Sequence, residues 1–174
     1  QALFNEGDQV AFGKDNMTSN KPVNPIPNFL STDAEKFCIN ALKDWRNTDN
    51  VTSITALLFE WDDADVTPIE QVRAFINSAI PFTTMVYSGG KSIHVIVRFV
   101  EPIENKAWQE SWWNAISEGL QKFGIVPDNK ARLIVQLSRV PESTRANTGK
   151  NQSLVTIRKR VNQSEMIEWL TTNG

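Results

Sequence analysis

The sequence predicts an α+β protein in which helices are layered against a largely antiparallel sheet. The first observation is the mixed order of strand-like and helix-like segments along 174 residues, a length typical of one domain. The second is a pair of strand-like segments, 83–88 and 91–100, separated only by Gly89-Gly90. Strands joined by a short glycine turn form an antiparallel hairpin. We therefore expect α/β layers over a mostly antiparallel sheet.

The first fifty residues are weakly patterned. Prolines at positions 22, 25 and 27 interrupt any regular element and favour an extended arm. Ser31-Thr32-Asp33 with Glu35 is typical of a helix start, and helical spacing continues, so we expect a helix from Ala34 to Trp45. We interpret 1–50 as an N-terminal arm and helix, and 51–174 as the core of one compact domain.

The remaining elements alternate between strand and helix patterns. Residues 51–61 are rich in Val, Ile, Thr, Leu and Phe, which predicts a central strand. Thr67-Pro68-Ile69-Glu70 predicts a helix start, because Pro is favoured at the first helical position and Glu in the first turn. A long amphipathic helix is expected over 104–123, with Trp108 and Trp112 on its core face. A short segment at 127–130, a strand over 154–160 and a helix over 164–171 follow.

Composition limits the class of protein. About 40% of the residues are hydrophobic, which is enough for a core, and no run of eighteen apolar residues predicts a membrane span. No signal peptide is visible, so we expect a cytoplasmic protein. The chain begins with Gln1, which we interpret as a piece of a longer protein. Cys38 is the one cysteine, which excludes an internal disulfide and predicts a buried free thiol on a helix.

The charge is distributed unevenly along the chain. Residues 1–90 carry 6 basic and 12 acidic side chains, a net of −6, and residues 91–160 carry 12 basic and 6 acidic, a net of +6. A basic half suits a polyanion such as nucleic acid. A merely solvated surface accounts for the same counts equally well.

An acidic cluster stands at the end of the strand over 51–61. Glu60 and Asp62 are two residues apart, so they share a face while the strand lasts. Two carboxylates on one face repel each other unless a cation lies between them, and oxygen ligands suit Mg²⁺ or Mn²⁺. An ordinary acidic loop is the alternative interpretation.

The hairpin carries Gly89-Gly90-Lys91-Ser92-Ile93-His94, with the only histidine of the chain. Ser92 and His94 point to one face of the strand, beside a lysine, which predicts a site for an anion. The segment is not a phosphate-binding P-loop, because that spacing is absent and a strand follows. One histidine also excludes a two-histidine metal cluster. A tight turn with a half-exposed histidine is the alternative.

A third group of polar residues follows the long helix. Asp128 precedes three arginines, of which Arg139 is flanked by Leu137 and Val140 and is expected to be partly buried. A guanidinium in that position suits bidentate phosphate binding. An N-cap role for Asp128 competes with a catalytic one.

In order and spacing, these groups resemble the catalytic core of the archaeo-eukaryotic primase superfamily, in its primase-polymerase branch from phages and mobile elements. Glu60-Trp61-Asp62 resembles the first motif of that family, Ser92-Ile93-His94 the second and Asp128 the acid of the third. Residues 137–145 resemble its Arg-x-Pro-Gly stretch, with Glu142 in place of Gly. The resemblance covers about 51–160, so it implies that 1–50 is an addition of one lineage.

The resemblance implies a fold with an RNA-recognition-like (RRM-like) sheet and a companion α/β unit. It implies that Glu60, Asp62 and Asp128 hold two Mg²⁺ or Mn²⁺ ions for nucleotidyl transfer. Lys91, Ser92, His94 and Arg139 would bind the incoming nucleotide, and Lys130 and Arg145 are candidates for contacts with nucleic acid or phosphate.

The implied partners are a single-stranded DNA template, a primer, nucleoside triphosphates and a fused or separate helicase. The function expected from the sequence is therefore a DNA-dependent primase-polymerase. Two alternatives remain: an inactive module of the same fold that binds single-stranded nucleic acid or a nucleotide, and a metal-dependent nuclease using the same acids.

Overall fold

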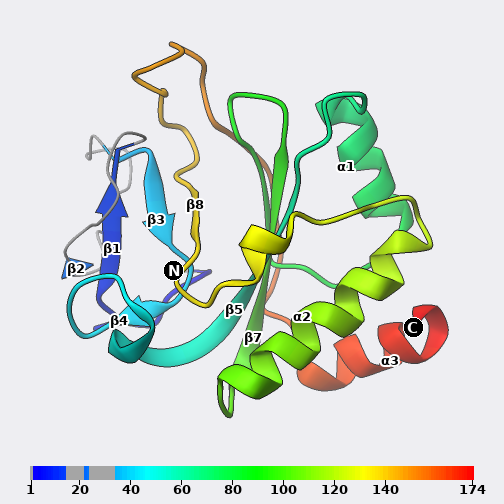
Figure 1. The fold of residues 1–174 in the computed structure, drawn as a ribbon, viewed down its shortest axis with the longest axis horizontal. Helices are drawn as coiled ribbons and strands as arrows, with labels where there is room; N and C mark the ends of the chain where they lie inside the picture. Colours follow the sequence, from blue (N-terminus) through cyan, green and yellow to red (C-terminus); the bar gives the residue numbers. More distant parts are fainter. Residues whose placement is uncertain (1, 15–21, 24–33) are drawn as a thin grey trace.

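A computed structural model describes residues 2–14, 22–23 and 34–174 (Figure 1). These residues form two antiparallel sheets and three α-helices, which confirms the α+β class. The larger sheet has the order β4-β5-β7-β6-β9. Its strands are β4 (Ala41–Leu42), β5 (Val51–Trp61), β6 (Thr84–Tyr87), β7 (Ile93–Ile103) and β9 (Ser153–Ile157).

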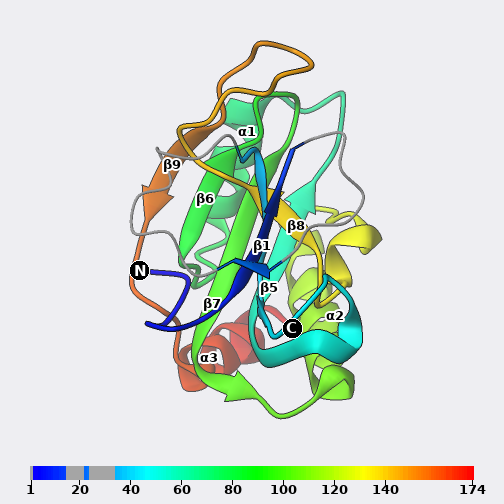
Figure 2. The same ribbon diagram turned by 90° about the vertical axis from the view of Figure 1, so that its left-hand side faces the viewer.

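The larger sheet is covered on both faces. Three helices lie against one face (Figure 1): α1 (Pro68–Asn77), α2 (Lys106–Gln121) and α3 (Gln163–Asn173). A smaller sheet of order β2-β1-β3-β8 lies on the other side, as the turned view in Figure 2 also shows. Its strands are β1 (Val10–Gly13), β2 (Pro22–Val23), β3 (Lys36–Cys38) and β8 (Leu137–Arg139). Two short 3-10 helices, η2 (Thr48–Asn50) and η3 (Asn129–Arg132), complete the described elements.

The central position predicted for the strand over 51–61 is confirmed, because β5 lies between β4 and β7. The residues from Thr55 to Phe59 are all buried, since layers cover both faces of the sheet. On the helical face, Phe59 stacks on Trp113 of α2 with ring centroids 5.7 Å apart. Trp113 Nε1 also donates a hydrogen bond of 2.8 Å to the carbonyl oxygen of Leu58. This packing fixes the end of β5 that carries the acidic cluster.

The helix starts follow their local signals. The helix start predicted at Thr67-Pro68-Ile69-Glu70 is confirmed, and the structure adds a capping box between Thr67 and Glu70 at the start of α1. In α2 the predicted core face is partly wrong, because Trp108 is 56% exposed and Trp113 is buried instead. The two positions differ by five residues, and the face that packs on the sheet is selected by the stacking of Trp113 on Phe59.

The helix predicted over Ala34 to Trp45 is wrong, because this segment forms β3 and β4. Phe37 pairs with Phe12 of β1 on one side and with Ser138 of β8 on the other. The buried Asn40 bends the chain between the two strands, and its side-chain oxygen accepts hydrogen bonds from the backbone of Thr55 and Ala56. Pairing between distant segments thus overrides the local helical spacing. The proposed cap at 31–33, Pro25 and Pro27 lie outside the described residues.

Cys38 is a buried free thiol, as predicted, although it lies on a strand. Burial raises the pKa of this thiol to about 11, which disfavours the reactive thiolate. The RRM-like detail of the sheet and the boundary near residue 50 stay predictions. In the described ranges, none of the helices combines the length and apolar character that crossing a bilayer requires.

Candidate functional site

The candidate site lies where β5 and β7 run side by side. Glu60 of β5 and Val86 of β6 are both paired in register with His94 of β7. Because directly paired residues of neighbouring strands face the same side, the Glu60 carboxylate and the His94 imidazole lie on one face of the sheet. This is the face toward the smaller sheet, since His94 Nδ1 lies 3.3 Å from Ser138 Oγ of β8.

The Glu60 carboxylate receives contacts from the second predicted motif. Ser92 Oγ donates to Glu60 Oε1 over 3.1 Å, and His94 Nε2 lies 3.1 Å from the same oxygen, an ion-pair distance without the alignment of a hydrogen bond. Burial raises the pKa of Glu60, but His94, Ser92 and the charge of Arg139 outweigh it and bring the pKa to about 2. Glu60 is therefore ionised throughout the neutral range.

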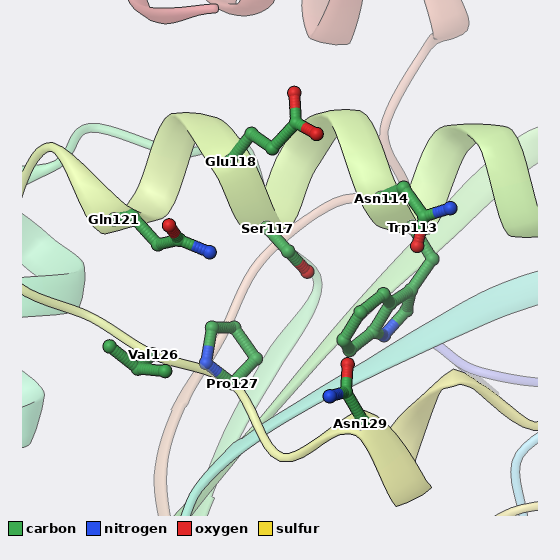
Figure 3. Close-up of a pocket in the computed structure, with 8 residues that line it drawn as sticks. All are labelled: Trp113, Asn114, Ser117, Glu118, Gln121, Val126, Pro127 and Asn129. Atoms are coloured by element: carbon green, nitrogen blue, oxygen red, sulfur yellow. The ribbon is translucent and has the colours of Figure 1, made fainter.

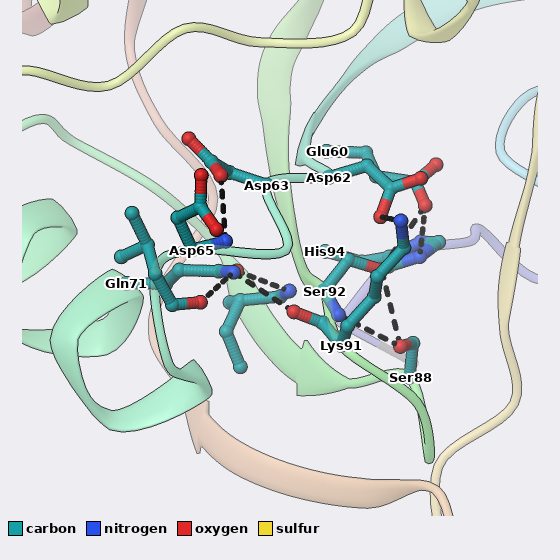
Figure 4. A network of polar contacts seen from close by, with 11 residues as sticks. Glu60, Asp62, Asp63, Asp65, Gln71, Ser88, Lys91, Ser92 and His94 are labelled. Atoms are coloured by element: carbon teal, nitrogen blue, oxygen red, sulfur yellow. Dashed lines mark hydrogen bonds and ion pairs between the residues drawn. The ribbon is translucent and has the colours of Figure 1, made fainter.

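Asp62 lies on the same side of the hairpin as Glu60 (Figure 4). Its carboxylate forms an ion pair of 3.2 Å with Lys91, and both side chains are partly exposed. The structure thus brings Glu60, Asp62, Lys91, Ser92 and His94 together, although the two segments are about thirty residues apart in sequence.

Asp128 is held beside β5 through its backbone. Its N–H donates a 2.7 Å hydrogen bond to the carbonyl oxygen of Glu60. Its side chain caps η3 by accepting from the Lys130 N–H over 2.9 Å. The N-cap interpretation of Asp128 is therefore confirmed, and the catalytic one stays a prediction. Lys130 itself is exposed on η3.

The carboxylates at the site are the right type of ligand for a divalent cation, but their side chains are engaged with other residues. Glu60 and Asp62 supply carboxylate oxygens on one side of the hairpin, the ligand type that Mg²⁺ and Mn²⁺ prefer. Across the described ranges, no three His, Cys, Asp or Glu side chains are grouped closely enough to hold a metal ion. Lys91 neutralises Asp62 here, and Ser92 and His94 surround one oxygen of Glu60. Metal binding at Glu60, Asp62 and Asp128 stays a proposal.

Two predicted arginines lie near these groups, Arg139 at the end of β8 and Arg145 in the polar stretch after it. Arg139 is near enough to lower the pKa of Glu60. Arg145 packs on the glycine turn, since a Cβ built on Gly90 would lie 3.1 Å from its Nη1 atom. Gly89 has a φ of +70°, and a Cβ there would lie 3.0 Å from the carbonyl oxygen of Asn151. Gly89 is thus required by its left-handed backbone conformation and by the Asn151 carbonyl, whereas a Cβ at Gly90 would meet only the end of the flexible Arg145 side chain.

Sequence reasoning missed the residue that holds the hairpin in place. Gln71 of α1 is fully buried, and its Nε2 donates to the carbonyl oxygen of Lys91 over 2.8 Å. Its Oε1 accepts from the N–H of Ile93 over 2.9 Å, so the two bonds flank Ser92. Nothing in the sequence distinguishes a glutamine that bonds to a neighbouring hairpin from any other glutamine in a predicted helix. Ser88, the residue before the glycine turn, also contacts this group, because its Oγ lies 3.1 Å from Ser92 Oγ.

Comparison with known proteins supports the fold. No protein-family model matches the chain, and no curated protein is similar to it in sequence. Among solved structures, it is similar to the AEP domain of the cyanophage S-2L primase-polymerase, with a TM-score of 0.67 and 19% sequence identity. The match covers 97% of this chain and 92% of the cyanophage domain. The expected resemblance to archaeo-eukaryotic primases is therefore confirmed as a shared fold.

Proposed function

We propose that this chain, which has the fold of a primase-polymerase domain, makes or extends primers on single-stranded DNA by transferring nucleotides from nucleoside triphosphates. The observation that carries the proposal is the side-by-side placement of an acidic group at the end of β5 and an anion-binding group at the start of β7. Glu60 and Asp62 lie against Lys91, Ser92 and His94 in a fold that a cyanophage primase-polymerase shares.

The anion-binding group is suited to the phosphates of the incoming nucleotide. Lys91 and Arg139 supply positive charge, and Ser92 and His94 supply hydrogen-bond donors. Their contacts with Glu60 and Asp62 orient these donors before substrate binds. Lys91 can turn to the phosphates once Asp62 has another cationic partner.

The acidic group is suited to the metal-assisted step. Glu60, Asp62 and Asp128 are the residues that would hold Mg²⁺ or Mn²⁺, and two such ions would supply activation of a primer 3′-hydroxyl and charge stabilisation of the leaving pyrophosphate. Because the pKa of Glu60 is about 2, this carboxylate needs no deprotonation before it binds a cation. The hydrogen bond from Asp128 N–H to Glu60 keeps the third acid beside the strand.

Primer extension on a labelled primer–template tests the proposal. We expect the purified chain to lengthen the primer only when nucleoside triphosphates and Mg²⁺ or Mn²⁺ are present. Shortened primers would contradict transfer and favour the nuclease alternative. Unchanged primers, together with retained DNA binding, would favour an inactive binding module.

His94→Ala separates a phosphate-binding histidine from a structural one. We expect about tenfold weaker triphosphate binding, the effect of losing one hydrogen bond to a charged group, and less than about twofold change in binding of single-stranded DNA. Titration calorimetry measures the first and fluorescence anisotropy the second. Because His94 is buried and touches Ser138, an equal loss of both affinities would show that its role is structural.

A further inference from the structure

A pocket separate from the Glu60–His94 group lies on the helical side of the sheet, between α2 and the loop that leads to η3 (Figure 3). Its volume is about 230 Å³. The lining residues are Trp113, Asn114, Ser117, Glu118, Gln121, Val126, Pro127 and Asn129. The proposed nucleotidyl transfer uses none of them.

One polar atom of this pocket, the hydroxyl oxygen of Ser117, has no hydrogen-bond partner among the described residues. Ser117 is 6% exposed, its Oγ makes no hydrogen bond, and Figure 3 shows the hydroxyl aimed between Pro127 and Trp113. A buried hydroxyl without a partner costs free energy, which a ligand able to exchange a hydrogen bond with it would recover.

The lining chemistry limits what this ligand is. Asn114, Gln121 and Asn129 each offer both a donor and an acceptor, whereas Glu118 is the only charged residue that lines the pocket. A phosphate would be repelled by that carboxylate and would meet no cation. Indole, proline ring and Val126 surfaces instead favour a flat, uncharged ring with polar edges. The volume is below the range usual for a whole drug-sized ligand, so one ring system fits better than an entire nucleotide.

The surroundings indicate that such a ring arrives on a polyanion. Lys130 and Arg132 follow Asn129 by one and three residues on η3, and both are exposed. Asp128, one residue before Asn129, is bonded through its backbone to Glu60 of the candidate site. A strand whose phosphates follow η3 would therefore pass both this pocket and the candidate site.

We propose that the pocket between α2 and η3 holds one unpaired base of single-stranded DNA. The ring packs against Trp113 and Pro127. Its edges form hydrogen bonds with Ser117 Oγ and with the side-chain amides of Asn114, Gln121 and Asn129. Lys130 and Arg132 bind the adjacent phosphates. The proposal rests on the proposed function for the identity of the strand, which is the template of the polymerase site.

The test is an abasic scan on a primer–template, whose primer end fixes the register of the template overhang. Each overhang nucleotide is replaced in turn by an abasic one, and binding is measured by fluorescence anisotropy without incorporation. For the unsubstituted chain we expect one position at which base removal weakens binding about tenfold, the effect of losing one stacked base. Ser117→Leu, which fills the pocket, should weaken binding of the intact DNA equally and abolish the dependence on that position.

The matched control is Ser111→Leu, the same change on the same helix at an exposed position outside the pocket. It should retain the abasic profile of the unsubstituted chain. If Ser117→Leu unfolds the chain, Gln121→Ala at the exposed rim carries the test, with about threefold weaker binding at the same position. An abasic profile that is unchanged in the pocket variants overturns the proposal. A Ser117→Leu variant that no longer binds a free deoxynucleoside but binds the DNA as before also overturns it. Because the readout is binding, failure to extend primers contradicts the proposed function alone.

Discussion

Asp62→Asn and Asp128→Asn should each lower metal-dependent nucleotide incorporation by about 10³-fold or more, because each removes a charge that the proposed ions require. Asparagine keeps the size of the side chain in both cases. At Asp128 it also keeps the cap on η3, since Asn and Asp are equally good N-cap residues. Single-turnover primer extension in Mg²⁺ and in Mn²⁺ measures the effect.

The matched control is Asp65→Asn, an exposed acid in the same loop that makes no contact with the hairpin in Figure 4. It should retain nearly full incorporation, and all three variants should bind single-stranded DNA like the unsubstituted chain. Incorporation that stays within a few-fold after either Asp62→Asn or Asp128→Asn would remove that residue from the catalytic assignment.

Asp8→Ala should lower the free energy of unfolding by about 3 kcal/mol, the lower end of what breaking a buried ion pair costs. Its partner Arg98 is 1% exposed on β7, with Nη2 3.7 Å from Asp8 Oδ2. Burial, followed by the charge of Arg160, lowers the pKa of Arg98 to about 10, and Asp8 opposes this shift. Without Asp8, the guanidinium would keep its charge in the interior, beside Thr55, the ring of Phe4 and the like charge of Arg160. Urea unfolding measures the change.

Two further variants identify the cause. Asp44→Ala, at an exposed acid, should change stability by less than about 0.5 kcal/mol. Combining Asp8→Ala with Arg98→Leu should restore part of the loss, because no unpaired charge is then buried. A double variant as unstable as the sum of the two single ones would show that Asp8 acts through packing and not through the charge of Arg98.

Local signals in the sequence were sufficient for the elements that carry the proposed chemistry. The capping box of Thr67 and Glu70 involves only residues three apart in sequence, so it marks the start of a helix independently of the rest of the fold. The hairpin of β6 and β7 depends on its glycine turn, and alternation predicts that Ser92, just before β7, and His94 share a face, as their contacts with Glu60 show. The shared fold with a primase-polymerase domain then confirms the resemblance that these motifs indicated.

The errors lie where distant segments decide the outcome. The segment from Ala34 to Trp45 has helical spacing, yet the hydrogen bonds of β3 with β1 and β8 make it a strand. In α2, the buried face depends on the stacking of Trp113 on Phe59. The spacing of residues along the helix does not indicate this contact, because Phe59 lies on a distant strand. In both places a contact across the fold outweighs a local preference worth a few tenths of a kcal/mol per residue.

The types and order of the chemical groups follow from the amino-acid sequence alone: two acids at a strand end, a serine and a histidine after a glycine turn, and a later acid before arginines. The tertiary structure alone decided their contacts. It pairs Lys91 with Asp62 and brings Ser92 and His94 to one oxygen of Glu60. It also bonds the buried side-chain amide of Gln71 to the backbone on both sides of Ser92. The physical reason is that residue types and alternation are local properties, whereas a hydrogen bond depends on which strands and helices become neighbours when the core is buried.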